Sequence, residues 1–472
     1  MNGQVALFAA FRKGKNFRMR SMADRPTDAC GVIGLYKVND AAALAALGLH
    51  ALQHRGQESA GIVTSYKGEL LCYKGMGLVA NVFANGDGAR LPGDSAIGHV
   101  RYSTTGASDL INAQPLMARY SGGQVAVAHN GNLVAGKRLA EALSAKGALF
   151  QTSTDTEIFL HLLAQEHAMN EEALATMLGH AGPAFSLVML FPDRMIAARD
   201  PWGIRPLVLG RIGQGYVVAS ETCAFDQTGA SYEREIRPGE MIVCDAKGCR
   251  ASFFGKEGAP ETRCLLEHIY FARPDSVVFG ETPHVMRCKS GLVLAKEHPA
   301  KADIVVAIPD SGVSAAQGYA QGMDLPLERG LIRNHYVGRS FIAPGPEARA
   351  MAVRMKHNVV REVVQGKRVV LVDDSLIRGT TTTTLSRELR DAGATEVHLR
   401  IACPPTRHPC LYGVDFPERE ELLAHRYSLK SIRRKLNMDS LGYLSLEGLT
   451  GIFGEERECF CTACWTGEYP AL

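Results

Sequence analysis

Residues 369–384 read VVLVDDSLIRGTTTTT, and this stretch decides the fold of the second half of the chain. Its apolar start predicts a buried strand, and Asp373 and Asp374 follow at the carboxyl end, where open α/β sheets bind ligands. Gly379 turns the backbone inward, and a helix beginning at Thr380 offers free N–H groups to an anion. Each of these residues is common at strand ends and helix caps, but together they indicate a site for Mg²⁺ or ribose hydroxyls beside a phosphate.

The chain around this stretch alternates between strands and helices from about residue 300. Residues 302–312, ADIVVAIPDSG, predict a strand and a loop that lead into a helix over 313–323, and residues 395–403, TEVHLRIAC, predict a further strand. Apolar strands that alternate with amphipathic helices form parallel sheets with helices on both faces. The second half is therefore predicted to be a doubly wound α/β domain.

Residues 30–255 follow a different pattern, in which short apolar or alternating runs are separated by Gly, Asn and Asp. These runs predict many short strands. Apolar residues at helical spacing predict two helices, over residues 41–56 and 154–167. The first half is thus expected to contain layered sheets covered by helices, and the polar stretch at residues 255–263 is expected to link it to the second half.

Composition limits the possible functions. The 472 residues are 46% hydrophobic and 21% charged, which is typical of globular domains, and no apolar run is long enough for a membrane-spanning helix. The net charge is +3, yet the first 29 residues hold six Lys or Arg and only two Asp, so the rest of the chain is close to neutral. A nearly neutral body gives no reason to expect nucleic acid or membrane binding. Any anionic ligand is therefore expected to bind at a local site.

The first 29 residues resemble no folded element. Their positive charges follow the apolar run VALFAAF instead of preceding it, which argues against a secretory signal. A short propeptide, an organelle transit peptide and a later start at Met19 or Met22 are the alternatives. With no secretion signal, twelve cysteines predict free thiols in a reducing compartment, and we expect a cytoplasmic protein.

Cys30 stands directly after this leader, in DACGVIGLY at residues 28–36. Removal of the leader would make Cys30 the N-terminal residue, and an α-amino group, with a pKa near ~8, is able to take the thiol proton. The alternative is a small buried cysteine in a strand. Five polar segments favour the nucleophile: HRGQES (54–59), GHVRYSTTG (98–106), NAQP (112–115), AHNGNL (128–133) and TSTDTE (152–157).

These segments supply groups that suit one kind of substrate. Arg101 is able to clamp a carboxylate, and Asp155 is able to hold an ammonium group. Asn130 and the Gly131 amide are able to stabilise an oxyanion. An α-amino acid with a side-chain amide to cleave, namely glutamine, fits this set.

The order of these motifs resembles the glutamine amidotransferase domain of N-terminal-nucleophile enzymes, which has an αββα sandwich fold. The stretch at 369–384 resembles the 5-phosphoribosyl-1-diphosphate motif of type I phosphoribosyltransferases, and over about residues 30–470 the chain resembles the amidophosphoribosyltransferase family. The resemblance implies that Cys30 releases ammonia from glutamine and that ammonia replaces the diphosphate of phosphoribosyl diphosphate, the first committed step of purine synthesis. It implies a leader at 1–29, a glutaminase domain at 30–260, a phosphoribosyltransferase domain at 261–430 and a C-terminal segment at 431–472.

The same resemblance implies the residues that bind each ligand. Glutamine is expected to bind Arg101, Asn130, Gly131 and Asp155. Phosphoribosyl diphosphate is expected to bind Asp373, Asp374, Ser375, Arg378, Gly379, Thr380 and Thr381, with Mg²⁺ at Ser311, Asp373 and Asp374. The family further implies feedback inhibition by purine nucleotides and a homotetramer. One departure is Gly312, which follows Ser311 where close relatives often place another hydroxyl residue.

The C-terminal cysteines predict a metal site. Cys461 and Cys464 form a C-x-x-C pair, which alone is a weak indication of a metal or redox site. The family resemblance adds Cys264 and Cys410 as the other two ligands of a [4Fe-4S] cluster, while four thiolates also suit zinc. Cys459 is assigned no role.

The basic segment at residues 333–358 contains Pro and Gly and is too irregular for a core element. On composition alone it is a solvated loop. It is similar to the loop that closes over the phosphoribosyl substrate in the family, where closure excludes water and completes the path of ammonia.

Two other functions compete with this interpretation. An enzyme of the glucosamine-6-phosphate synthase type shares the glutaminase half but needs a sugar isomerase half, against which residues 373–381 argue. A non-enzymatic regulator that binds phosphoribosyl diphosphate, and DNA through a basic element, would need no intact glutaminase set. The neutral body and the segments around Cys30 argue against that regulator.

Overall fold

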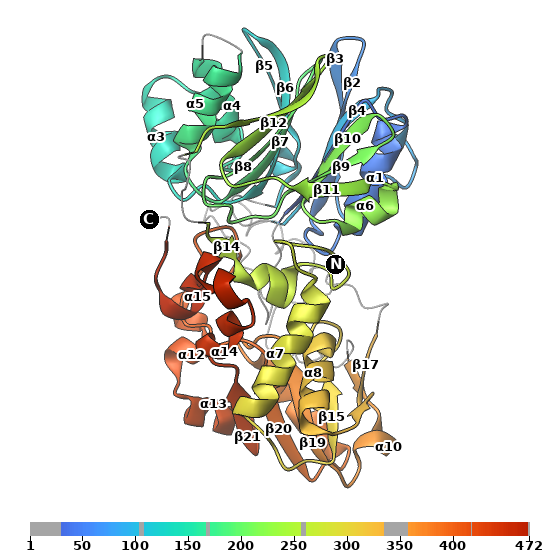
Figure 1. The fold of residues 1–472 in the computed structure, drawn as a ribbon, viewed down its shortest axis with the longest axis vertical. Coiled ribbons are helices and arrows are strands. Elements are labelled where there is room, and N and C mark those ends of the chain that lie inside the picture. The colour runs from blue at the N-terminus through green and yellow to red at the C-terminus, as the bar shows by residue number, and fades with distance from the viewer. Residues whose placement is uncertain are drawn as a thin grey trace, which may run out of the picture.

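The computed structural model describes residues 30–102, 108–166, 170–255, 261–334, 357–416 and 418–470. Figure 1 shows two halves stacked along the long axis, with two antiparallel sheets in the upper half and one parallel sheet in the lower half. The leader, most of the linker and most of the segment at 333–358 lie outside the described residues. Within the described residues, no helix has the length and hydropathy needed to cross a membrane.

The first sheet of the upper half has seven strands in the order β11-β9-β10-β1-β4-β2-β3. Its central strand β1 pairs antiparallel with β4 and β10. The helices α1 (Ala41–Ala51) and α6 (Cys223–Thr228) pack on its outer face. Its strands are β1 (Gly31–Tyr36), β2 (Ser59–Tyr66), β3 (Glu69–Met76), β4 (Ser95–Arg101), β9 (Val208–Ile212), β10 (Gly215–Ala219) and β11 (Ser231–Glu235).

The second sheet has six strands in the order β13-β12-β8-β7-β6-β5, and it is also antiparallel. Its outer face carries α3 (Gly136–Ala145), α4 (Glu157–Gln165) and α5 (Glu171–Ala181). Its strands are β5 (Leu116–Tyr120), β6 (Gly123–Gly131), β7 (Phe185–Leu190), β8 (Met195–Arg199), β12 (Glu240–Asp245) and β13 (Gly248–Phe253). The short helix α2 (Val79–Val82) and the 3-10 turns Gly88–Arg90 and Leu110–Asn112 complete this half.

Three apolar layers hold the upper half together. Residues of both sheets, among them Val32, Ile97 and Val188, fill the space between the sheets. Two further clusters join each sheet to its own helices. Because both faces of each sheet are covered, the inner strands β1, β4, β7 and β8 are buried along their whole length, whereas the edge strands β3, β11 and β13 are partly exposed. The predicted αββα sandwich is confirmed.

The helix prediction for this half is correct in place but incomplete. Of the two expected helices, α1 ends at Ala51, before the expected end at residue 56, and α4 spans Glu157–Gln165. The sequence patterns do not predict α3, α5 and α6. The start of α5 had a signal, because the Asn170 side chain accepts a hydrogen bond from the Ala173 N–H at 2.9 Å as an N-cap. No side-chain cap marks the start of α3.

The lower half contains the predicted parallel sheet, in the order β16-β15-β19-β20-β21. Figure 1 shows α7 (Pro283–Glu297) and α8 (Val313–Met323) side by side across it. The strands are β15 (Ile304–Ala307), β16 (Leu327–Glu328), β19 (Arg368–Asp373), β20 (Glu396–Ile401) and β21 (Ser440–Tyr443). The other helices are α10 (Arg361–Val364), α11 (Thr380–Asp391), α12 (Leu423–Arg426), α13 (Leu429–Lys435), α14 (Leu446–Gly451) and α15 (Ala463–Thr466).

Two small sheets, a π-helical turn and the 3-10 turns Arg419–Glu421 and Gly454–Cys459 complete the described part of the lower half. β14 (Arg263–Cys264) pairs with β22 (Phe460–Cys461), and β17 (Leu331–Arg333) pairs with β18 (His357–Val359). The π-helical turn Glu267–Phe271 follows β14 at the junction of the two halves. Since β21 lies beyond residue 430, the parallel sheet extends into the segment that the sequence analysis separates at 431–472.

The cysteine and charge patterns are visible in the structure. Cys244 and Cys249 face each other across the β12–β13 hairpin and form a disulfide, so the expectation of free thiols is wrong for this pair. Opposite residues of an antiparallel pair bring their Cβ atoms within reach of each other. The remaining ten cysteines are free.

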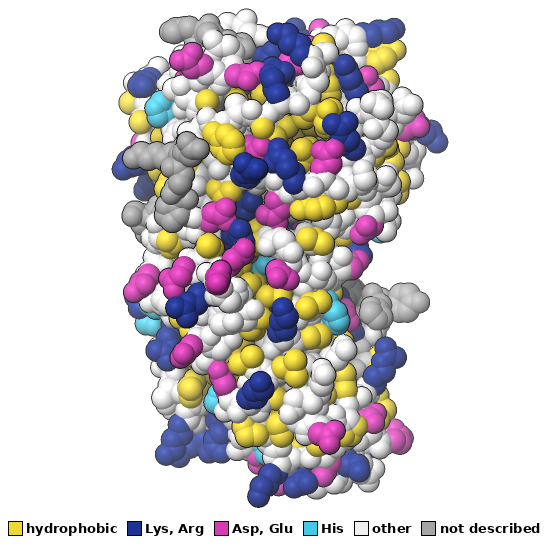
Figure 2. Space-filling view, viewed as in Figure 1, with side chains coloured by type: hydrophobic (Ala, Val, Ile, Leu, Met, Phe, Trp, Pro, Cys, Tyr) yellow, Lys and Arg dark blue, Asp and Glu magenta, His cyan; other side chains and the backbone are white. Residues whose placement is uncertain are grey.

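Figure 2 shows positive and negative side chains interspersed over one face.

Candidate active sites

Cys30 lies at the start of β1, at the edge of the sandwich that faces the lower half. Its side chain is buried, and its Sγ lies 3.4 Å from the carbonyl oxygen of Tyr102. Burial raises the pKa of the Cys30 thiol, and the nearby Arg101 guanidinium only partly opposes this shift. The thiol therefore needs a base to become a nucleophile.

The two side chains predicted to bind the α-carboxylate and α-ammonium groups of glutamine, Arg101 and Asp155, lie near this thiol. Arg101, Glu58 and Asp155 are the charged side chains that act electrostatically on Cys30. Arg101 ends β4, is almost fully buried, and has its Nη1 3.8 Å from Glu58 Oε2. Asp155 Oδ2 accepts a hydrogen bond from the Leu133 N–H at 2.7 Å. The site thus places a cation and a carboxylate beside the thiol.

Asn130 is the least satisfied polar side chain at this site. It is fully buried in β6, and neither atom of its amide has a hydrogen-bond partner among the described residues. An unpaired buried polar group costs about 1–3 kcal/mol, so Asn130 is not explained by stability and points to a ligand. Its neighbour Gly131 has φ +146°, and a Cβ there would lie 1.9 Å from the Ala184 carbonyl oxygen. Only glycine fits that position.

The polar segments predicted from sequence are tied together by side chains that the sequence analysis did not assign. Gln114 accepts a hydrogen bond from the His129 N–H at 2.8 Å and donates to Thr156 Oγ1 at 2.9 Å. Asn112 makes two hydrogen bonds to Ser153. The NAQP segment therefore links β6 to the segment that contains Asp155 through hydrogen bonds.

The second site lies at the carboxyl end of β19. Asp373 and Asp374 are both buried, and Asp373 Oδ1 accepts the Asp374 N–H at 3.0 Å. Ser375 Oγ donates to Asp374 Oδ1 at 2.5 Å. The strand and the two acids lie where the sequence predicts them. The acids end the strand whose neighbours β15 and β20 also end at this edge.

The loop after these acids has the form predicted for an anion site. Gly379 has φ +80° and directly precedes α11, which begins at Thr380. The first N–H groups of such a helix have no intrahelical partner. Arg378 pairs with Glu421, its Nη2 3.2 Å from Glu421 Oε2. The loop therefore combines the N–H groups that begin α11, the threonine hydroxyls and the Arg378 guanidinium.

Ser311 lies in the loop after β15 and lines the same cavity as Asp374, together with Arg287 and His268. A Cβ on the next residue, Gly312, would lie 2.7 Å from the Val372 carbonyl oxygen. The glycine that departs from relatives thus allows this loop to approach the end of β19 closely.

The four predicted cluster cysteines are brought together near the junction of the halves. Cys264 and Cys461 are opposite each other in the β14–β22 pair. Cys264 interacts electrostatically with Cys410 and Cys461, and Cys464 interacts with all three. Burial raises the pKa of Cys461 to about 12. Thiols in this state are protonated until a metal displaces the proton.

No three His, Cys, Asp or Glu side chains among the described residues are close enough to hold a single metal ion. Mg²⁺ is commonly held by one or two carboxylates with water and substrate phosphates. A [4Fe-4S] cluster takes one thiolate on each of four irons, so its ligands stand farther apart than those of one ion. The donor chemistry of the four cysteines fits such a cluster.

Comparison with known proteins agrees with this two-site arrangement. A family model described as a glutamine amidotransferase domain matches residues 99–227, and one described as a phosphoribosyl transferase domain matches residues 288–417. The amidophosphoribosyltransferase of Bacillus subtilis is 46% identical over 447 residues, covering 93% of this chain and 94% of that protein. The chain belongs to the amidophosphoribosyltransferase family. The chloroplastic amidophosphoribosyltransferase of Glycine max is 49% identical over 449 residues, covering 94% of this chain and 79% of that protein.

The family membership extends to the fold. The B. subtilis glutamine phosphoribosylpyrophosphate amidotransferase, solved in complex with ADP and GMP, matches with a TM-score of 0.89 and 45% identity, over 94% of this chain and 98% of that one. The protein is therefore an enzyme that uses glutamine to aminate phosphoribosyl diphosphate, the first step of purine synthesis. The sugar isomerase and regulator alternatives are wrong, because the phosphoribosyltransferase domain and the glutaminase domain occur in one chain of this family.

Proposed function

We propose that Cys30 is the N-terminal nucleophile of the glutaminase half, after removal of residues 1–29. The observation that carries the proposal is the buried Asn130 amide, which has no hydrogen-bond partner among the described residues. Arg101 and Asp155, which lie near Cys30, supply the other groups that glutamine needs. Arg101 binds the α-carboxylate of glutamine, and Asp155 binds its α-ammonium group. Burial raises the pKa of the Cys30 thiol, so the thiol needs a base to lose its proton. The freed α-amino group of Cys30 is that base.

Each residue then has one step in the glutaminase reaction. The Cys30 sulfur attacks the carbon of the side-chain amide, and the developing oxyanion is held by Asn130 Nδ2 and the Gly131 N–H. The α-ammonium group of Cys30 returns its proton to the leaving nitrogen, and ammonia departs. Water hydrolyses the resulting thioester, which releases glutamate and restores the thiol.

The phosphoribosyltransferase half positions the acceptor. Asp373 and Asp374 bind the two ribose hydroxyls, and the N-terminus of α11 binds the 5-phosphate. Ammonia attacks C1 of the ribose, and the bond from C1 to the diphosphate breaks. Ser311, Asp373 and Asp374 would hold Mg²⁺, which would supply positive charge to the leaving diphosphate. The residues that contact the substrate are Asp373, Asp374, Ser375, Arg378, Gly379, Thr380 and Thr381.

Four further properties complete the proposal. Cys264, Cys410, Cys461 and Cys464 hold a [4Fe-4S] cluster that fastens the C-terminal segment to β14. Purine nucleotides act as feedback inhibitors, which the ADP and GMP bound to the B. subtilis structure support. The active assembly is a homotetramer. The location is cytoplasmic, whereas the plant relatives are named chloroplastic.

Intact mass of the purified protein tests the processing step. A denatured mass that begins at Cys30 is expected. A mass that retains Ala29 in every active molecule would remove the α-amino mechanism. The same sample, weighed in native form without oxygen, is expected to carry the extra mass of four irons and four sulfides.

Replacing Asn130 with alanine tests the oxyanion site. We expect glutamine-dependent kcat to fall about 100- to 1000-fold, while Tm does not fall, because an unpaired buried amide is removed. Glutamate release and thermal unfolding measure the two quantities. Asn81→Ala, at an exposed position of α2, is the control. A variant with unchanged kcat would show that Asn130 does not face the oxyanion.

Replacing Cys464 with serine tests the cluster. The buried serine cannot replace a thiolate ligand of iron, so iron content and visible cluster absorption are expected to be lost, with a lower Tm. Cys459→Ser is the matched control, because Cys459 belongs to the same segment but is not among the four ligands. Stoichiometric zinc in place of iron in the native protein would contradict this part of the proposal.

A further inference from the structure

A buried carboxylate of the second half lies between two arginines of the first half. Glu267 begins the π-helical turn Glu267–Phe271, whose neighbours Leu266 and Ile269 belong to the core of the second half. Its Oε2 accepts a hydrogen bond from Arg55 Nη2 at 2.5 Å, and its Oε1 accepts one from Arg205 Nη1 at 3.1 Å. All three side chains have no exposed surface. Such a charge is stable only while its partners stay in place.

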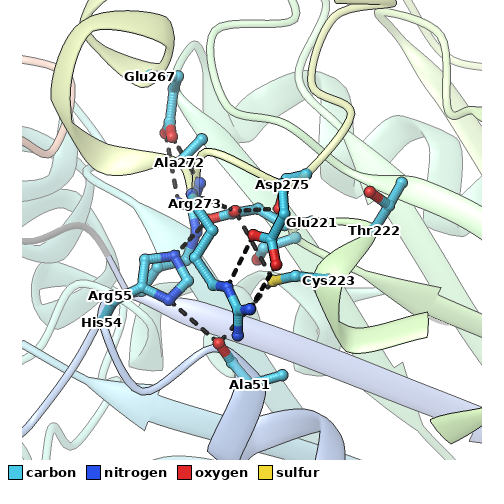
Figure 3. Close-up of polar contacts among 12 residues, drawn as sticks. Ala51, His54, Arg55, Glu221, Thr222, Cys223, Glu267, Ala272, Arg273 and Asp275 are labelled. Carbon is cyan, nitrogen blue, oxygen red and sulfur yellow. Dashed lines mark hydrogen bonds and ion pairs between the residues drawn. The ribbon is translucent and has the colours of Figure 1, made fainter. Parts of the chain in front are cut away.

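The first arginine lies under the nucleophile. A Cβ on Gly31, the residue after Cys30, would lie 3.4 Å from Arg55 Cδ. Gly56, the residue after Arg55, packs on Arg101, since a Cβ there would lie 2.7 Å from the Arg101 backbone nitrogen. Arg55 also pairs with the buried Glu221, as Figure 3 shows. Arg55 therefore packs against the residue that follows the thiol, and its neighbour Gly56 packs against the backbone of Arg101.

The same Glu221 carboxylate holds a second segment of the junction. Its Oε1 lies 2.7 Å from His54 Nε2, and its Oε2 accepts the Arg273 N–H at 2.9 Å (Figure 3). The Ser276 hydroxyl donates to the same oxygen at 2.7 Å. The polar groups around Arg55 are thus fully engaged, and Glu267 is the contact that comes from the second half's core.

The second arginine holds the loop that backs the oxyanion site. Arg205 Nε and Nη2 donate to the Tyr412 carbonyl oxygen at 3.0 and 2.8 Å. A Cβ on Gly413 would lie 2.8 Å from the carbonyl carbon of Gly131, so the loop touches the oxyanion segment. Asn132 Nδ2 also donates to the Leu411 carbonyl oxygen at 2.8 Å. Arg205 thereby fixes the backing of Gly131.

We propose that Glu267 is a positioning residue for glutamine hydrolysis, through which the second half sets both the nucleophile side and the oxyanion side of the glutamine site. The inference rests on the proposed roles of Cys30 and Gly131. Glu267 touches neither glutamine nor the reacting atoms. It acts because one carboxylate holds Arg55 and Arg205 at a fixed separation.

The turn that carries Glu267 is also held from the phosphoribosyl side. Arg287, on α7, donates from Nε to the His268 carbonyl oxygen at 2.7 Å and from Nη2 to the Ala272 carbonyl oxygen at 2.8 Å. Asp374 is the strongest charged partner of Arg287, and both line one cavity. Hydrogen bonds thus join Arg287 to the turn of Glu267, and an electrostatic interaction joins Arg287 to Asp374, so the effect of phosphoribosyl diphosphate on glutamine kinetics is a second readout of the inference.

Glu267→Gln in the full chain, with its metals, tests the inference. Glutamate release with glutamine and diphosphate release with external ammonia are measured on the same preparation. Because displacement of a catalytic group by about 1 Å costs about 100-fold, we expect kcat for glutamine hydrolysis to fall by that factor. Ammonia-dependent diphosphate release is expected to stay within about twofold, and any dependence of glutamine KM on phosphoribosyl diphosphate is expected to weaken.

Glu456→Gln is the matched control, since Glu456 forms an ion pair with Arg263 close by on the surface, and both activities are expected to be unchanged. If Glu267→Gln loses both activities equally, or loses neither, the positioning role is overturned. Glu267→Asp keeps the charge but has a shorter side chain, so it serves as the test if Glu267→Gln does not fold. If kcat for glutamine hydrolysis is the same in Glu267→Asp as in the unmodified enzyme, the inference is overturned.

Cys30→Ser separates the inference from the function on which it rests. If Cys30→Ser keeps glutamine-dependent activity, the proposed nucleophile is wrong whatever Glu267→Gln shows. If Cys30→Ser loses that activity while Glu267→Gln keeps it, only the positioning role is wrong.

Discussion

Replacing Cys30 with serine is expected to abolish glutamine-dependent diphosphate release while ammonia-dependent release persists. A hydroxyl is a far weaker nucleophile than a thiol when the base is a single amino group, and loss of a nucleophile typically costs at least about 10³-fold in kcat. The phosphoribosyl acids and α11 belong to the other half of the molecule, so external ammonia still meets its acceptor there. Glutamate and diphosphate, each measured with both nitrogen sources, give the result.

Cys72→Ser provides the control for this experiment, because Cys72 is an exposed free cysteine of β3. The control is expected to keep both activities. Serine at position 30 that still hydrolyses glutamine at the original rate would exclude Cys30 as the nucleophile. Loss of ammonia-dependent release as well would mean that the substitution disturbs more than the glutamine site.

Replacing Asp374 with asparagine is expected to lower both the glutamine-dependent and the ammonia-dependent reactions. Asparagine keeps the size of the side chain but removes the charge that, in the proposed site, accepts from ribose hydroxyls and lies near Mg²⁺. Electrostatic groups of this kind are worth about 10² in rate, so kcat/KM for phosphoribosyl diphosphate should fall by about that factor with either nitrogen source. Initial rates of diphosphate release over a range of the substrate measure the effect.

Asp391→Asn, at the exposed end of α11, is the matched control and should leave both rates unchanged. Hydrolysis of glutamine without phosphoribosyl diphosphate should be affected little in Asp374→Asn. Equal loss there would mean that the variant disturbs the whole chain. Unchanged kcat/KM for phosphoribosyl diphosphate would exclude Asp374 from the substrate site.

The residues that sequence predicts well are those whose chemistry is local. The strand, the two acids and the start of α11 follow one another within residues 369–384, and their geometry depends mainly on that order. Arg101, Asn130 and Asp155 stand in motifs that are visible in the sequence, but only the structure shows that Arg101 and Asp155 lie near Cys30. The helices α3 and α6 escape prediction, and the lack of a side-chain cap does not explain this, because the predicted helices α1 and α4 lack one too.

Other parts of the site have no local signal. Glu267 and Arg205 are ordinary charged residues in sequence, and only the docking of the two halves shows that both are buried against each other. The Cys244–Cys249 disulfide depends on the register of a hairpin, and a cysteine count alone cannot give register. The leader and most of the basic segment at residues 333–358 lie outside the described residues, so their predicted roles stay predictions.

The pairing of β14 with β22 has a consequence for how the chain is made. Cys264 emerges early in the synthesis of the second half, but its partner strand contains Cys461, close to the C-terminus. Contacts between distant parts of a chain form slowly, and domains begin to fold during synthesis from the N-terminal side. The glutaminase sandwich is thus able to form before the cysteine site, which needs both β14 and the much later β22. The proposed insertion of iron and sulfide would therefore follow the folding of the first half, and a shortage of either would leave β14 and β22 without the link that the cluster provides.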